Sequence, residues 1–174
     1  QLDGTAHGCP QLVDAILCWA GLPGGSRHHW GSDVDVIDAA AMPEGYRVQL
    51  VPSEYAPGGY GYIGGKTYAT GSAIANTDDD TLFQTEHWGM EAYRLDVPNG
   101  TYRVELLFDE IYMTRQGGRV FDVKLQGVTV LSRFCPLDVA GGINRALHYT
   151  YETTVSNGQL FIEFVAVKDA PKVN

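Results

Sequence analysis

The sequence predicts an all-β protein: an antiparallel β-sandwich preceded by a short N-terminal helix and loop extension. From residue 34 onward, apolar side chains recur at alternate positions in short segments, and Asn-Gly or Gly-Gly pairs separate these segments. One segment near the start of the chain has helical periodicity instead. With 44% hydrophobic residues among 174, the chain can bury the core of one domain. We expect residues 1–33 to form the extension and residues 34–174 to form the sandwich.

The expected helix covers residues 10–20, PQLVDAILCWA. Its apolar side chains repeat at the spacing of one helix face. Pro10 suits a helix start, and Gly21 followed by Pro23 suits its end. Residues 21–33 are then expected to be loop.

The expected strands follow in chain order. Alternation begins at 34–37 and returns at 47–51, and a short strand is expected at 82–85. Three turns centred on Asn-Gly or Gln-Gly then predict three hairpins. The paired segments are 92–97 with 102–108, 120–125 with 128–131, and 147–155 with 160–167.

Charge and cysteine content limit the class of protein. The formal net charge of −9 disfavours nucleic acid as a partner, because an acidic surface repels phosphate backbones. The chain has no run of 18 apolar residues that would span a membrane, so no membrane partner is expected. Cys9, Cys18 and Cys135 give an odd count, which excludes full disulfide pairing within one chain. Either Cys9 and Cys18 close a small loop in an oxidising compartment, or all three thiols are reduced.

Residues 58–123 hold aromatic side chains beside glycine pairs and an acidic run. A sandwich core needs aromatic residues, but not in loop-like or strand-edge positions. Six aromatic residues occupy such positions: Tyr60, Tyr62, Tyr68, Trp88, Tyr93 and Tyr112. Flat apolar rings beside polar acceptors suit a sugar ring, whose faces are apolar and whose hydroxyls need hydrogen-bond partners. The alternative is that these aromatic residues belong to the core.

Five sequence blocks in this region are similar to malectin and the malectin-like carbohydrate-binding modules, in the same order and at the same spacing. The resemblance covers residues 58–173. The blocks are YGYIGG (60–65), TDDDTLFQTEHWG (77–89), VPNGTYRVELLFDEIY (97–112), RVFDVKLQG (119–127) and DAPKV (169–173).

This resemblance implies a jelly-roll type β-sandwich that binds glucose-containing oligosaccharides or glucan-type polysaccharides in a loop-lined cleft. It implies a binding module that is not an enzyme, that requires no cofactor and that can be part of a larger carbohydrate-active enzyme. It also implies a secreted, cell-surface or periplasmic location.

The family's sugar-contacting residues correspond to six positions of this sequence. The resemblance assigns this role to Tyr62 or Tyr60, Trp88, Tyr112, Met113 and Asp169. Two positions depart from the family pattern, because Met113 replaces an aromatic ring and Trp88 replaces a tyrosine. These departures predict a different sugar preference or a looser grip.

The acidic run Asp78-Asp79-Asp80 allows a second interpretation, since calcium prefers several oxygen ligands. The alternative is a solvated loop whose carboxylates cap a turn.

Residues 10–59 resemble the zinc-binding part of bacterial D-Ala-D-Ala carboxypeptidases of the VanY type. The similar stretch is LPGGSRHHWGSDVDVIDAAAMP (22–43), in which His28 and Asp35 would be zinc ligands. A zinc peptidase also needs a third protein ligand and a general base, and no later segment of this chain supplies them. The alternative function is therefore an inactive peptidase fragment, with a natural or engineered seam between the two families at Gly58–Tyr60.

Overall fold

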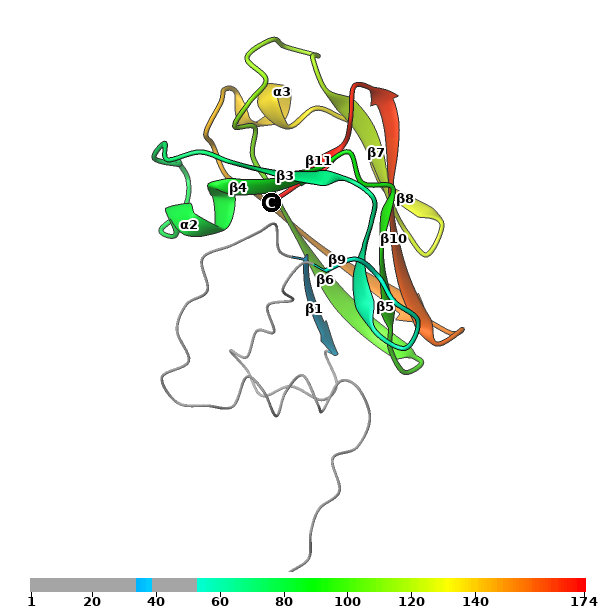
Figure 1. The fold of residues 1–174 in the computed structure, drawn as a ribbon. Helices are drawn as coiled ribbons and strands as arrows, with labels where there is room; N and C mark the ends of the chain where they lie inside the picture. Colours follow the sequence, from blue (N-terminus) through cyan, green and yellow to red (C-terminus); the bar gives the residue numbers. More distant parts are fainter. Residues whose placement is uncertain (1–33, 39–52) are drawn as a thin grey trace, which may run out of the picture.

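The computed structural model of the protein describes residues 34–38 and 53–174 (Figure 1). The helix expected at 10–20 and the strand expected at 47–51 lie outside the described residues. In chain order the elements are β1 (Val34–Asp38), β2 (Tyr60–Ile63), β3 (Lys66–Ala69), α2 (Asp80–Phe83), β4 (Thr85–Trp88), β5 (Ala92–Asp96), β6 (Gly100–Phe108), β7 (Val120–Leu125), β8 (Val128–Phe134), α3 (Pro136–Ala140), β9 (Leu147–Val155), β10 (Gln159–Lys168) and β11 (Lys172–Val173).

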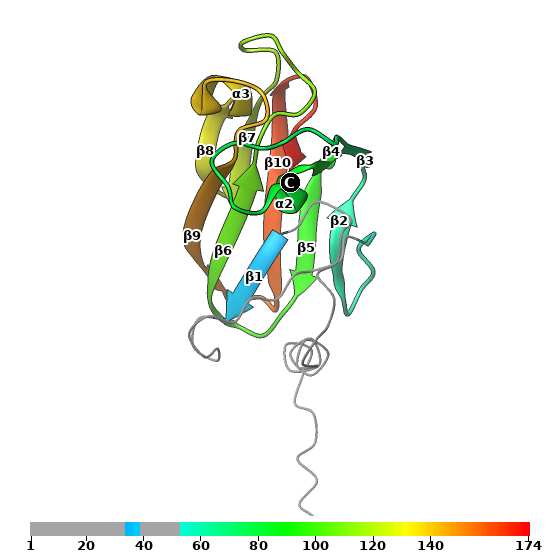
Figure 2. The ribbon, with the colours of Figure 1, turned by 90° about the vertical axis from the view of Figure 1, so that its left-hand side faces the viewer.

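Two antiparallel sheets face each other. One has the strand order β1-β6-β9 and the other the order β2-β5-β10-β7-β8 (Figure 2). A third, small sheet with the order β11-β4-β3 lies at one end of the sandwich, on the side where α3 is found (Figure 1). The predicted all-β antiparallel sandwich is confirmed. Across the described part of the chain, no helix is long and apolar enough to cross a membrane.

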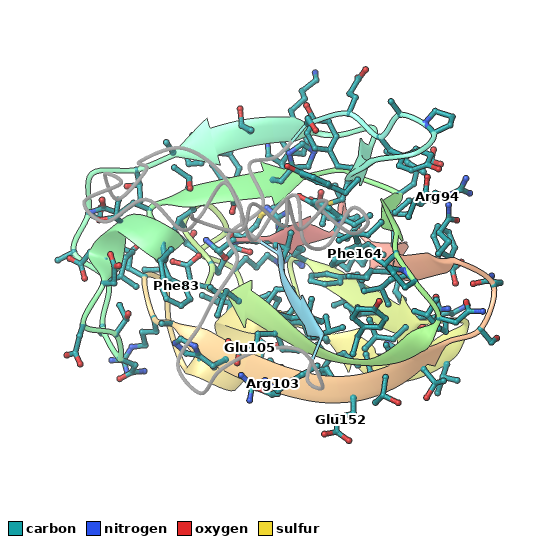
Figure 3. The ribbon with its side chains drawn as sticks, turned by 90° about the horizontal axis from the view of Figure 1, so that it is seen from below. Phe83, Arg94, Arg103, Glu105, Glu152 and Phe164 are labelled. Atoms are coloured by element: carbon teal, nitrogen blue, oxygen red, sulfur yellow. The ribbon has the colours of Figure 1, made fainter. Side chains whose placement is uncertain are left out.

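The core fills the space between the two large sheets, because alternate side chains of each strand point inward. On β10, Leu160, Ile162 and Phe164 are buried, and Figure 3 shows Phe164 in the interior with Arg94 on the outside. Val104 of β6 has no exposed surface and faces them in the same apolar cluster. Burying each such side chain contributes about 2 kcal/mol to folding.

A second apolar cluster lies under α2, at the end that carries the small sheet. Phe83 packs there with Leu107 and Ile111, and in Figure 3 it lies well apart from Phe164. Residues 80–83 form the helix α2, so the strand expected at 82–85 is wrong in its first half. The side chain of Asp79 accepts a hydrogen bond from the Thr81 amide and caps this helix, and the strand β4 begins only after it.

The strand expected at 34–37 is confirmed as β1. It pairs antiparallel with β6, from Val34 opposite Leu106 to Asp38 opposite Tyr102. It occupies one edge of the first sheet.

One of the three predicted hairpins is confirmed, the β7–β8 pair. Its turn residues Gln126 and Gly127 both have positive φ, 50° and 78°, as a tight two-residue turn requires. The other two are wrong, because β5 and β6 lie in different sheets, and so do β9 and β10. The chain crosses between the sheets at both Asn-Gly turns, and the side chain of Asn99 accepts a hydrogen bond from the amide of Gly158 at 2.8 Å.

Candidate functional site

The small sheet places three side chains of the candidate site on one of its faces. Strands β3 and β4 pair with Tyr68 opposite Glu86 and Lys66 opposite Trp88. Opposed residues of an antiparallel pair point to the same side, and so do alternate residues of one strand. Tyr68, Glu86 and Trp88 therefore project together, away from His87 on the other face.

A cleft of about 210 Å³ opens over this face. Its lining residues come from β3, β4, the segment between β6 and β7, and the segment between β10 and β11: Tyr68, Glu86, Trp88, Tyr112, Met113, Arg119 and Asp169. Tyr68 and Tyr112 are 41% and 62% exposed, more than most of the large apolar residues that the structure describes. Their rings meet edge to face, with their centroids 5.6 Å apart and their planes at 79°.

Four of the six residues assigned to sugar contact lie together in this cleft: Trp88, Tyr112, Met113 and Asp169. The structure places Tyr60 and Tyr62 elsewhere. Both are partly buried on β2 and pack against the main core. The Tyr62 ring lies on His87 with a centroid distance of 4.1 Å, on the far side of the small sheet from the cleft.

Tyr68 is the aromatic residue of the cleft that sequence reasoning did not assign to it. It stood among the aromatic residues at loop-like positions, but the resemblance drew attention to the earlier YGYIGG block. The available signal was the short alternating segment KTYA before TEHW. Two short strands so close in sequence suggest pairing, but the register that puts Tyr68 opposite Glu86 is visible only in the structure.

Buried charged residues form the floor of the cleft and the layer beneath it. Glu86 and Arg119 line the cleft although each is at most 4% exposed. Arg119 Nε donates to Glu110 Oε2 at 2.9 Å, and its Nη2 lies 3.9 Å from Glu86 Oε1. Lys172 Nζ lies 2.9 Å from Glu86 Oε2 and 2.8 Å from Asp109 Oδ1. Glu86 therefore joins the two ion-paired halves of the cluster.

Asp109 belongs to this cluster and has no exposed surface. Burial raises the pKa of its carboxyl above the ordinary value, and the nearby Lys172 ammonium opposes that rise. The side chain of Asn174 binds the Asp109 carboxylate through Nδ2 and the Asp109 amide through Oδ1, each at 2.8 Å. These contacts attach β11 to the end of β6.

The cleft loops are held by the same charged groups. Glu110 Oε1 accepts hydrogen bonds from the amides of Tyr112 at 3.0 Å and Met113 at 2.8 Å. Arg119 Nη1 donates to the carbonyl of Ala170 at 2.8 Å, next to Asp169. Asp169 itself has a φ of 60°, and its carboxylate accepts from the Ala170 amide at 2.6 Å.

His87 supports the small sheet from behind. Its Nε2 lies 2.9 Å from the carbonyl oxygen of Gly64, so Nε2 carries the hydrogen and donates. Burial lowers the pKa of this imidazole below its ordinary value, because the charged form loses hydration. His87 is thus a neutral packing residue beneath the cleft.

The sequence suggested two metal sites, one at the acidic run 78–80 and one at His28 and Asp35, and the structure describes only part of them. Among the described residues, no group of three or more His, Cys, Asp or Glu side chains could hold a metal ion. In the acidic run, Asp79 caps α2, as the solvated-loop alternative expects. His28 lies outside the described residues, and for Asp35 the structure gives the backbone alone.

The fold and the cleft define a β-sandwich binding module with an aromatic-lined site at one end. The chain matches the Malectin domain family over residues 35–174 and belongs to that family. Family membership supports carbohydrate binding in general and is consistent with a protein that is not an enzyme.

The relatives agree with this assignment. Malectin-B from Xenopus laevis is 29% identical over 97% of this chain and 60% of its own length. Malectin from Homo sapiens is 32% identical over 57% of this chain and 39% of its own length. The crystal structure of Bacteroides uniformis β-glucuronidase superposes with a TM-score of 0.69 at 29% identity, over 81% of this chain and 17% of that enzyme. The chain therefore spans only part of each relative.

The resemblance to VanY-type carboxypeptidases finds no support in these comparisons. The family match begins at residue 35 and includes residues 35–59, which that resemblance also covered.

Proposed function

We propose that the protein binds gluco-oligosaccharides or glucan-type glycans in the cleft between Tyr68, Trp88, Tyr112, Met113 and Asp169, without catalysing a reaction. The observation that carries this proposal is the convergence of three aromatic side chains and an exposed carboxylate around one cleft. They come from four separate parts of the chain.

The chemistry of the cleft suits a pyranose. An aromatic ring buries an apolar sugar face. A carboxylate accepts hydrogen bonds from the sugar hydroxyls, and a tyrosine hydroxyl can donate or accept them. The volume of about 210 Å³ is below the range of roughly 300–1,000 Å³ of pockets that enclose drug-sized ligands. This size supports recognition of one or two sugar units of a longer glycan, with the rest in solvent.

The carboxylates of the cleft support binding rather than hydrolysis. Glycoside hydrolysis generally uses two carboxyl groups, one on each side of the scissile bond. Of the two that line this cleft, Glu86 is 1% exposed and ion-paired to Lys172, so Asp169 alone can approach a sugar.

The setting of the module is part of the same proposal. We infer that it serves a larger carbohydrate-active protein outside the cell or at its surface. The likeness to a segment of a β-glucuronidase supports this, since the matched region is 17% of that enzyme.

The proposal is tested by titrating α- and β-linked gluco-oligosaccharides into the protein in a calorimeter. We expect saturable binding. If Trp88→Ala and Tyr112→Ala lose this binding and keep the wild-type circular dichroism spectrum, the binding site is in the cleft. Tyr55→Ala is the matched control, because Tyr55 is a partly exposed tyrosine outside the cleft lining. No binding by the wild-type protein across the panel, or equal loss in the control, would contradict the proposal.

A further inference from the structure

The buried ion pair of Glu110 and Arg119 lies directly beneath the cleft loops. Glu110 follows β6 and has no exposed surface, and Arg119 precedes β7 and is 4% exposed. The segment between them, 111–118, contains the cleft residues Tyr112 and Met113. The two side chains meet at 2.9 Å and so close the base of this segment.

Each partner also binds the backbone of one cleft loop. The second carboxylate oxygen of Glu110 accepts hydrogen bonds from the amides of Tyr112 and Met113 in the segment after β6. A second nitrogen of Arg119 donates to the carbonyl of Ala170 in the segment before β11. The pair therefore forms a continuous chain of hydrogen bonds from the Tyr112 loop to the Asp169 loop.

We infer that the Glu110–Arg119 pair is a clamp that fixes the distance between the two loops of the cleft, and that both members are positioning residues for glycan binding. This inference rests on the proposed function. Tyr112 and Asp169 would contact the sugar, while the clamp acts through them.

The fork shape of arginine explains why this residue suits the clamp. The guanidinium presents donors in several directions at fixed angles, so one side chain reaches Glu110 and Ala170 together. A lysine ammonium at the end of its flexible stem could satisfy the charge of Glu110 but would not hold the same fixed geometry. Arg119→Lys thus separates charge from geometry.

The depth of the pair argues for positioning rather than for stability alone. Moving two charges out of water costs free energy that their attraction only partly offsets, so a buried ion pair is weak evidence for stability. Arg119 of this pair also lines the cleft, and the hydrogen bonds of the pair reach both loops. An apolar pair would fill the volume but would leave the amides of Tyr112 and Met113 without their acceptor.

The test compares Arg119→Lys and Glu110→Gln with the wild-type protein and with Tyr102→Phe. The Tyr102 hydroxyl donates to the carbonyl of Pro98 near the start of β6, the opposite end of that strand from Glu110. This control therefore loses a part-buried hydrogen bond away from the cleft. In Glu110→Gln, the side chain has one acceptor oxygen instead of two. It can no longer accept from Arg119 with one oxygen and from the amides of Tyr112 and Met113 with the other. Each protein is titrated with the tightest-binding gluco-oligosaccharide well below its unfolding midpoint.

Both clamp variants are expected to bind about tenfold more weakly, the order expected for losing one charge-assisted hydrogen bond. The Tyr102→Phe variant should bind like the wild-type protein. Amide hydrogen exchange at Tyr112 and Met113, measured without sugar, should be faster in Glu110→Gln and unchanged in Tyr102→Phe. This second measurement does not depend on the ligand.

Three outcomes separate the inference from the proposed function. If the wild-type protein binds no glycan, the proposed function fails, and unchanged exchange in Glu110→Gln then also removes the clamp. If the wild-type protein binds and both clamp variants bind equally well, the clamp alone is wrong. Equal weakening in Tyr102→Phe would show a general effect of stability and would overturn the positioning role.

Discussion

The rings of Tyr68 and Tyr112 meet edge to face in the lining of the cleft, with centroids 5.6 Å apart. Tyr68 lies on β3, whereas Tyr112 follows β6, so the sandwich brings together two strands of different sheets to make this contact. An edge-to-face pair leaves ring surface uncovered, and both residues are exposed to solvent. The contact therefore holds two exposed aromatic residues together in one cleft.

Tyr68→Ala is expected to weaken glycan binding about tenfold, because it removes one ring of the cleft and the edge-to-face support of Tyr112. Tyr68→Phe keeps the ring and should retain most of the affinity if stacking dominates. Calorimetric titration of both variants checks this. Wild-type affinity in Tyr68→Ala would exclude this residue from the site.

Met113→Phe is expected to tighten binding by roughly twofold to tenfold, since an aromatic contact contributes about 0.5–1.5 kcal/mol beyond the area that it buries. Met113 lines the cleft and is partly exposed, so a ring can be placed there without entering the core. Competition between the two proteins for an immobilised glucan gives the ratio of affinities. Weaker binding by the variant would mean that glycan binding requires the shape of the methionine side chain.

Stability is expected to fall as the solution is acidified below about pH 6.5, the pKa of an unperturbed histidine. Burial lowers the pKa of His87 in the folded state, so the unfolded chain binds the proton first. The neutral imidazole makes its full contribution to the free energy of unfolding above pH 6.5. This contribution is lost as the pH falls through the lowered pKa of the folded state. Thermal unfolding midpoints at pH 5 and pH 7.5 measure the effect.

A His87→Gln variant provides the comparison for that pH series. Glutamine can donate a hydrogen bond to the Gly64 carbonyl but does not titrate. The difference in unfolding midpoint between the variant and the wild-type protein should therefore shrink at low pH. A difference that stays constant between pH 5 and pH 7.5 would show that His87 does not cause the acid sensitivity.

Gly65→Ala is expected to destabilise the fold by about 2 kcal/mol or more, whereas Gly64→Ala should cost only about 1 kcal/mol. Both glycines have positive φ, 95° and 70°. A Cβ on Gly65 would also lie 2.5 Å from His87 Nε2 and 2.9 Å from the Met90 amide, while one on Gly64 meets nothing within 4 Å. Urea unfolding of the two variants separates backbone strain, which both share, from steric overlap, which only Gly65→Ala has. Equal losses of unfolding free energy would rule out an effect of the overlap.

The positions of most strands could be predicted from the sequence, because alternation of apolar and polar residues is a local property. The partners of those strands could not. Asn99-Gly100 and Asn157-Gly158 correctly mark reversals of the chain, yet both connect strands in opposite sheets. An Asn-Gly pair fixes the turn, while the returning strand buries its apolar face equally well beside its neighbour or across the core from it.

For the cleft, family-like sequence blocks led to Trp88, Tyr112, Met113 and Asp169, whose assignment to sugar contact stays a prediction. Tyr68, Glu86 and Arg119 complete the lining and were not assigned. Their inclusion depends on strand register and on side chains that reach across the chain, and neither is encoded in local spacing. The register of β3 on β4 decides which of Tyr68 and its neighbours faces the cleft.

The sequence by itself determined an all-β chain with aromatic residues outside its core, since periodicity and composition act over a few residues. Tertiary structure alone decided which aromatic residues share a cleft and which charged residues hold its loops. Tyr62 and Tyr68 are separated by one turn in sequence, but β2 pairs with the large sheet and β3 with the small one. The choice of partner strand depends on how the whole chain buries its apolar surface. It packs Tyr62 against the core and leaves Tyr68 exposed in the cleft.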